Sequence, residues 1–224
     1  DNDQRERRIL EFKRIVGPVV LLYDPLSASA LTALIEAFPR EVVAVLRPLN
    51  SVLNIPKASD GRIDLLTPVT LFHLSFRDFL VDPALKNESE FWIDTRETHH
   101  KLGMCCIRLL ESGSLREDVC GVVSLGTRRS QVAKSTVRSS LPEGVAYACC
   151  YWIQHIVSSE EQIKDDGAVH RFLRKHMLHW IEALSWLGKA SDVIRGLAAL
   201  RSRVDVSRTR YLLLTRYTDK LWTA

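Results

Sequence analysis

The sequence lacks the long apolar run and the leader pattern that would place it in or across a membrane. Its longest apolar run, residues 16–23, is interrupted by Gly17 and Pro18 and is much shorter than the roughly 20 residues that cross a bilayer. Residues 1–8 carry charges of both signs, whereas a secretory signal is basic and then apolar. We therefore predict no membrane segment. Because the sequence starts without methionine, we expect a piece of a longer protein.

Cysteine is scarce and is not spaced as in metal sites. The five cysteines include two vicinal pairs, show no CxxC spacing and lie among apolar neighbours. This pattern predicts small core residues in a reducing, cytoplasmic compartment rather than disulfides or zinc ligands. The five are Cys105, Cys106, Cys120, Cys149 and Cys150.

The short motifs of common catalytic sites are missing as well. Gly188-Lys189 is followed by Ala190 and lacks the earlier glycine of a phosphate-binding loop. The seven histidines form no HExxH pattern, and no GxSxG serine elbow occurs. We therefore expect no catalytic residue, no metal site and no cofactor held by this chain alone, which argues against a stand-alone enzyme.

What remains is ordinary globular composition, with 46% hydrophobic and 26% charged residues, 10 Gly and 8 Pro among 224 residues. That length suits one large or two small domains. The net charge is +4, and residues 189–224 hold eight basic residues against Asp192, Asp205 and Asp219. Since these bases alternate with Val, Leu and Tyr, they indicate a solvated helix face rather than a nucleic-acid patch, with an acidic partner as the alternative.

Residues 1–95 show the element order of a winged helix. Apolar residues at helical spacing predict a first helix towards Tyr23, a second over residues 28–37 capped by Ser27, and a third from Pro39 to Pro48. Two β-rich stretches, residues 51–55 and 69–74, flank a turn over residues 57–61. Three helices followed by a hairpin predict a winged helix over residues 8–95.

The apolar spacing of residues 96–224 predicts a helical domain. Before it, Ser75 should cap a short helix over residues 75–80, and residues 91–94 resemble a short strand. Helices follow over residues 99–110, starting at Thr95 or Thr98, and over residues 145–157, 169–187 and 191–200, the last capped by Ser191. Residues 121–143 suit a mobile loop or a looser helix. The predicted fold is mainly α, a winged helix followed by an α-helical bundle or superhelical domain.

Three aromatic residues lie on the apolar stripes of two of these helices. Trp152 belongs to the helix over residues 145–157, and Phe172 and Trp180 to the helix over residues 169–187. Aromatic residues at helical spacing usually pack in a core. We predict that all three are buried in one core.

His73 is the candidate binding residue, because it ends an apolar strand and leads into the sequence LSFRDFL. This stretch resembles the winged-helix histidine element of STAND-type NTPases of the NLR class. In that class the histidine contacts the phosphate of bound ADP. Leu74 replaces the aspartate of the family's M-H-D pattern, whereas Arg77-Asp78-Phe79 fits its downstream x-R-D-apolar part. The alternative is that His73 only satisfies a backbone group at the strand end.

Six ordered blocks extend the resemblance over most of the chain, to fungal NACHT-domain proteins that often carry WD repeats. The blocks are residues 15–17 with 20–27, then 49–56, 73–80, 115–120, 147–152 and 178–185. The resemblance implies a regulatory module that follows a nucleotide-binding domain in a protein of signal transduction, innate immunity or heterokaryon incompatibility. His73 would then face ADP, ATP or GTP held by that upstream NACHT domain. Further partners would be downstream sensor repeats and a homo-oligomer formed on activation.

A winged helix can instead bind DNA, with its third helix in the major groove. That helix offers only Arg40 and Arg47 against Glu41, and its other positions are largely apolar. This pattern suits packing against protein, so a nucleic-acid-binding or general protein-interaction module is the alternative to the regulatory one.

Overall fold

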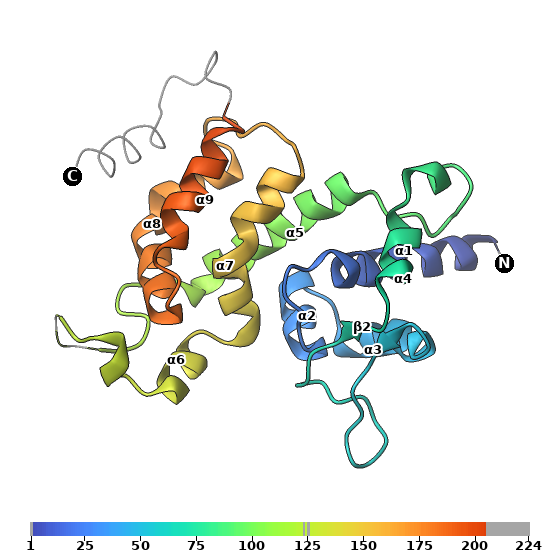
Figure 1. Cartoon of the computed structure of the whole chain (residues 1–224), viewed down its shortest axis with the longest axis horizontal. Helices are drawn as coiled ribbons and strands as arrows, with labels where there is room; N and C mark the ends of the chain where they lie inside the picture. Colours follow the sequence, from blue (N-terminus) through green and yellow to red (C-terminus); the bar gives the residue numbers. More distant parts are fainter. Residues whose placement is uncertain (1, 123, 125, 205–224) are drawn as a thin grey trace. The chain divides into compact units, whose positions relative to one another are not determined.

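The computed structural model describes residues 2–122, 124 and 126–204, and the fold is mainly helical (Figure 1). The chain divides into two compact units, residues 1–102 and 103–224. The division falls within helix α5 (Thr95–Leu109). The predicted boundary between residues 95 and 96 coincides with the start of α5, and the assignment of two domains stays a prediction.

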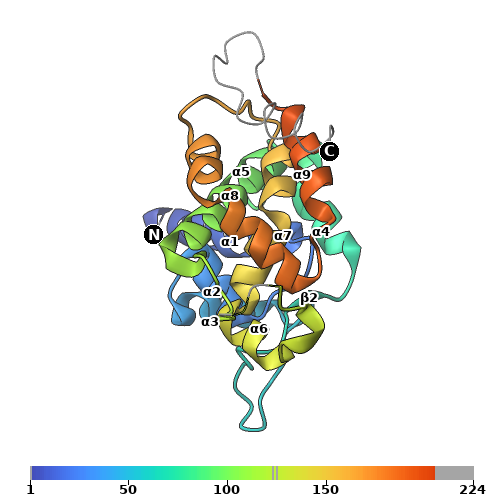
Figure 2. The same cartoon turned by 90° about the vertical axis from the view of Figure 1, so that its left-hand side faces the viewer.

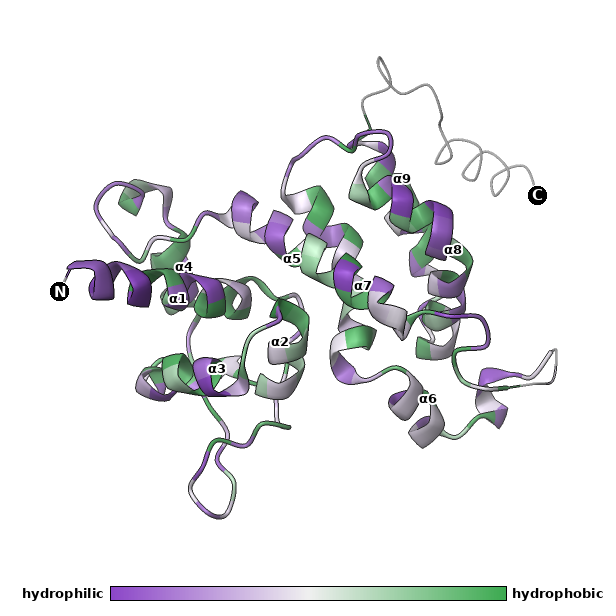
Figure 3. Ribbon diagram, turned by 180° about the vertical axis from the view of Figure 1, so that it is seen from behind, coloured by the Kyte–Doolittle hydropathy of each residue, from purple (hydrophilic) through white to green (hydrophobic). Residues whose placement is uncertain are grey.

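The first unit begins with α1 (Asn2–Leu21), whose two halves differ in character. The first half is hydrophilic and exposed, whereas the second half is buried from Ile15 onward (Figure 3). Gly17 and Pro18 lie inside this helix. A Cβ on Gly17 would lie 3.4 Å from the Thr98 side chain, so the absence of a side chain lets the start of α5 approach α1 closely.

Two further helices follow where their capping residues predict them. Ser27 caps α2 (Ala28–Ile35) by accepting a hydrogen bond from the Ala30 N–H at 3.1 Å. Pro39 occupies the first turn of α3 (Pro39–Leu46), where a missing N–H costs nothing. The chain then tightens into the 3-10 helix η1 (Arg47–Leu49), which contains Pro48.

The predicted hairpin is confirmed. Strands β1 (Leu53–Asn54) and β2 (Thr70–Leu71) pair antiparallel, with Leu53 opposite Leu71. An isolated bridge between Lys57 and Ile63 extends the hairpin towards its turn. The first unit therefore has the element order from which the winged helix was predicted, and the winged-helix assignment itself stays a prediction.

Two local predictions in this unit are wrong. Ser75 does not cap a helix, because α4 (Leu74–Val81) begins one residue earlier and has His73 at its N-cap position. Residues 91–94 form no strand. After the 3-10 helix η2 (Pro83–Leu85), the Ile93 N–H donates to the Leu80 carbonyl at 2.8 Å, and the Asp94 carboxylate accepts from the Glu97 N–H at 3.0 Å. Asp94 thus caps α5, which begins at Thr95.

The second unit is built around three long helices: α7 (Glu143–Ser158), α8 (Ala168–Leu187) and α9 (Asp192–Arg201). They lie side by side in both orthogonal views (Figures 1 and 2). The predicted aromatic core is confirmed. Trp152 lies 5.2 Å from Phe172 and 5.6 Å from Trp180 between ring centroids, all three are almost fully buried, and each pair packs edge to face.

Shorter segments complete this unit. The single-turn π-helix η3 (Leu110–Ser114) follows α5, and the region 121–143 contains the 3-10 helix η4 (Arg129–Gln131) and the short helix α6 (Lys134–Ser140). Ser191 stands at the N-cap position of α9, but its hydroxyl makes no capping hydrogen bond, so that predicted role is wrong. Four of the five cysteines are buried, as predicted for core residues, and Cys150 is half-buried.

Candidate functional site

His73 lies at the junction of β2 and α4 in the first unit. Its backbone is extended, with φ −139° and ψ 140°, which turns the chain from the strand into the helix. The side chain is exposed, and the imidazole makes no capping hydrogen bond to α4. The interpretation that His73 only satisfies a strand-end backbone group therefore has no contact to support it among the described residues.

Large apolar side chains surround His73 in the sequence and remain exposed to solvent. Phe72 is 51% exposed, Leu74 is 66% exposed and Phe79 is 52% exposed. Isolated exposed apolar residues are normal on protein surfaces, but two large ones directly beside His73 suit contact with another protein or domain. We call Phe72, His73 and Leu74, three consecutive exposed residues, the His73 surface. Phe79 comes five residues after Leu74 and therefore lies on another side of α4.

Arg77 and Asp78 follow on the exposed side of α4. Within the described part of the chain they form no ion pair with each other, so they are charges on the helix surface. Arg77 stands four residues after His73, which is about one helical turn. A positive charge therefore lies on the same helix as the imidazole.

The charge of Arg77 also reaches His99 at the start of α5. Partial burial lowers the pKa of His99, and the positive charge of Arg77 lowers it further. The His99 ring stacks on Tyr23, with 5.9 Å between ring centroids. No sequence pattern identifies this group, because Tyr23, Arg77 and His99 are far apart in the sequence and only the fold brings them together.

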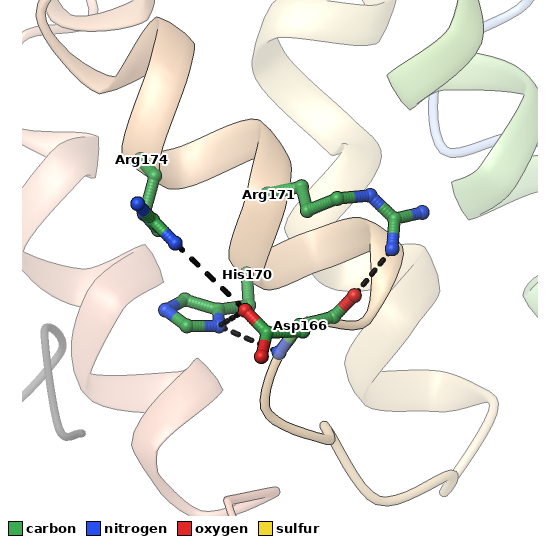
Figure 4. A network of polar contacts seen from close by, with 4 residues as sticks. All are labelled: Asp166, His170, Arg171 and Arg174. Carbon is green, nitrogen blue, oxygen red and sulfur yellow. Dashed lines mark hydrogen bonds and ion pairs between the residues drawn. The ribbon is translucent and has the colours of Figure 1, made fainter.

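A second polar cluster lies in the second unit, at the start of α8 (Figure 4). Asp166 donates its backbone N–H to His170 Nδ1 at 2.8 Å, and its backbone carbonyl accepts from Arg171. Its carboxylate lies 3.8 Å from Arg174 Nη1. Since every partner of Asp166 in this cluster comes from the first turns of α8, the cluster fixes the loop before the helix and is structural.

Two further histidine contacts each lie within one helix, the first buried and the second part-buried. The Tyr147 hydroxyl lies 2.7 Å from His155 Nε2, and both residues belong to α7. His176 Nδ1 lies 3.4 Å from His179 Nδ1 within α8. Burial, followed by the charges of Lys175 and His179, lowers the pKa of His176, while Glu111 raises it.

The described ranges 2–122, 124 and 126–204 hold no group of three or more His, Cys, Asp or Glu side chains placed to bind a metal ion. Across those same ranges, no helix is both long and apolar enough to span a membrane. The His73 surface is therefore the best candidate for a functional site, and contact with a partner or ligand is the chemistry that it offers.

Comparison with known proteins gives one partial similarity. The vegetative incompatibility protein HET-E-1 of Podospora anserina is 41% identical over 66 residues, which cover 26% of this chain. The chain spans 5% of the length of that curated relative. No family model matches the chain, and no solved structure matches it. The chain thus contains a segment similar to part of a fungal vegetative incompatibility protein.

Proposed function

We propose that this chain is the regulatory module of a fungal NLR-like signalling receptor, in which it holds an upstream NACHT NTPase in a closed, ADP-bound state. The observation that carries the proposal is the exposed imidazole of His73, at the start of α4 and without a capping hydrogen bond. The partial similarity to a vegetative incompatibility protein supports the same assignment.

The chemistry of His73 suits a contact with phosphate. An imidazole N–H can donate to a phosphate oxygen, and a hydrogen bond to a charged group contributes about 1.5 to 3 kcal/mol. A contact made only in the closed state shifts the equilibrium towards that state by its own free energy. That energy changes the ratio of closed to open protein by at least about tenfold.

The exposed apolar residues beside His73 fit the same role. A domain that closes over the His73 surface would bury Phe72 and Leu74, each of which is more than half exposed in this chain. Burial of such side chains contributes about 25 cal/mol per Å² of apolar area removed from water. The imidazole would then provide the nucleotide-dependent part of the contact, and the apolar residues the rest.

The structure does not favour the DNA-binding alternative. Of the basic residues that the sequence offers there, Arg40 lies over the Phe38 ring at 5.4 Å and Arg47 belongs to η1. Glu41 adds a negative charge and lies 3.6 Å from Arg14. Groove readout needs several basic and polar side chains on one helix face. We expect no retardation of a labelled DNA duplex by this chain.

The experiment is His73→Ala in the complete parent protein, purified without added nucleotide. We expect less retained ADP, measured by chromatography of the released nucleotide, and higher basal signalling than in the wild type. Ser75→Ala is the control, because Ser75 lies on the same exposed helix start and has no capping role. Unchanged ADP content together with unchanged basal signalling would overturn the proposed role.

A further inference from the structure

Arg129 attaches the loop before α6 to the C-terminal end of α8. Its Nε donates to the Trp186 carbonyl at 2.8 Å. The helix ends at Gly188, which adopts φ +75°, and a Cβ at that position would lie 2.7 Å from Arg129 Cζ. The guanidinium thus lies directly against the helix end, where a positive charge interacts favourably with the helix dipole.

Ser130 follows Arg129 in the three-residue helix η4. Both Arg128 and Arg129 have exposed side chains, and so does Ser130. The Ser130 hydroxyl has no hydrogen-bond partner among the described residues. From residue 119 to residue 142 the sequence holds no Asp or Glu, but it holds four basic residues, namely Arg128, Arg129, Lys134 and Arg138. Ser130 is therefore an accessible hydroxyl in a locally positive segment.

We propose that Ser130 is a phosphorylation site for a protein kinase whose substrate cleft is acidic, and that its phosphate draws Arg129 away from the end of α8. An acidic cleft complements the two arginines before the serine. In the reaction, Ser130 Oγ bonds to the γ-phosphorus of a nucleoside triphosphate as the bond from that phosphorus to its bridging oxygen breaks. The nucleoside diphosphate leaves, and the hydroxyl proton passes to the kinase base.

The displacement follows from the strengths of the two contacts that Arg129 can make. In this structure the guanidinium donates to a neutral carbonyl, that of Trp186. A phosphoserine carries about −1.5 to −2 charges and three acceptor oxygens. The bond to the Trp186 carbonyl has one charged partner, whereas a bond to phosphate has two, and arginine often binds phosphate through two parallel hydrogen bonds. Phosphorylation next to Arg129 thus competes for its guanidinium and loosens the helix end that this guanidinium stabilises.

The test incubates the chain with ATP and the catalytic subunit of cyclic-AMP-dependent protein kinase, and separately with a second kinase that prefers basic sequences. Intact-mass and peptide mass spectrometry then locate the phosphate. We expect it on Ser130 and absent from Ser130→Ala. Ser139 is the internal control, since it follows Arg138 but its hydroxyl donates to the Thr136 carbonyl at 2.9 Å. Failure of both kinases to modify Ser130, or equal labelling of Ser130→Ala, would overturn the site.

Hydrogen exchange tests the consequence separately. The N–H groups of Gly188 and Lys189 close the last turn of α8 by donating to the Ser185 and Leu184 carbonyls. Phosphorylation should speed their exchange by about 2- to 10-fold, the effect of losing one hydrogen bond. Arg129→Ala should reproduce the increase without kinase, and Arg128→Ala should not. Exchange at these amides that is unchanged by stoichiometric phosphate would show that Arg129 keeps its place.

Discussion

Trp180 donates its indole N–H to the backbone carbonyl of Cys149 at 2.8 Å, which joins α8 to α7 inside the aromatic core of the second unit. The hydrogen bond satisfies the one polar atom of a side chain that is 2% exposed. Trp180 also packs edge to face on Trp152. Trp180 therefore contributes buried apolar surface, ring packing and a hydrogen bond to this core.

Replacing Trp180 by Ala should lower the free energy of unfolding by about 3 to 5 kcal/mol, the range for deletion of a large aromatic side chain in a core. Urea denaturation followed by circular dichroism measures the change. Leu178→Ala is the matched control, because Leu178 lies on the same helix and is 75% exposed. The control should change the free energy of unfolding by no more than about 0.5 kcal/mol. Equal effects of the two substitutions would contradict the packing described for α8.

Ser27 and Ser75 form a second matched pair. Ser27→Ala removes the hydroxyl that caps α2 and should lower the free energy of unfolding by about 0.5 to 2 kcal/mol. Ser75→Ala should have almost no effect, because Ser75 lies inside α4 on its exposed side and caps nothing. Thermal or chemical denaturation of the two variants measures both changes in the free energy of unfolding. A larger loss for Ser75→Ala would reverse the assignment of the capping residue.

Gly188→Ala should be more destabilising than Gly121→Ala. Both glycines have positive φ, +75° and +66°, and an alanine in such a conformation costs about 1 to 2 kcal/mol. Gly188 differs in that a Cβ would also collide with Arg129, whereas a Cβ at Gly121 meets nothing within 4 Å. The difference between the free energies of unfolding of the two variants measures the cost of placing a Cβ against Arg129. If the two variants were equally stable, moving Arg129 from the end of α8 would cost no measurable stability.

Acidification should lower the stability of the chain. In the folded chain, burial lowers the pKa of both His176 and His99. In the unfolded chain both histidines titrate near about 6.5. At a pH below about 6.5 these histidines therefore bind protons more readily in the unfolded state than in the folded state. The free energy of unfolding falls as the pH drops through this range. Denaturation at pH 7.5 and 5.5 measures the loss, which should be smaller in His176→Gln. If His176→Gln lost as much stability between pH 7.5 and 5.5 as the wild type, His176 would not contribute to the pH dependence.

Local sequence signals predicted much of the fold. Ser27, Pro39 and the turn over residues 57–61 each fix a boundary through short-range chemistry, and all three have the predicted roles. The helical spacing of Trp152, Phe172 and Trp180 predicted the core, because apolar residues that recur on one helix face must be covered.

The errors have physical causes too. Residues 91–94 are apolar enough for a strand, but no neighbouring strand pairs with them in the described first unit, and Asp94 instead caps α5. The stacking of Tyr23 on His99 and the attachment of Arg129 to the end of α8 join residues distant in sequence. Spacing along the chain carries no signal for such contacts. His73 could be singled out only because it stands where a strand meets a helix and because its neighbours resemble a known element.

The central claim is that His73 contacts a nucleotide phosphate in the closed parent protein. In the isolated chain His73→Ala should change the free energy of unfolding by no more than about 0.5 kcal/mol, since the side chain is exposed and makes no capping bond. This result would establish that the variant folds normally, so that its effect on the parent protein can be attributed to binding.

The most direct measurement is the equilibrium affinity of the complete parent protein for ADP, determined by titration calorimetry for the wild type, His73→Ala and the control Ser75→Ala. Loss of a hydrogen bond to a charged phosphate should weaken ADP binding by about 10- to 100-fold in His73→Ala, with Ser75→Ala like the wild type. An ADP affinity in His73→Ala equal to that of the wild type would contradict the proposed role of His73.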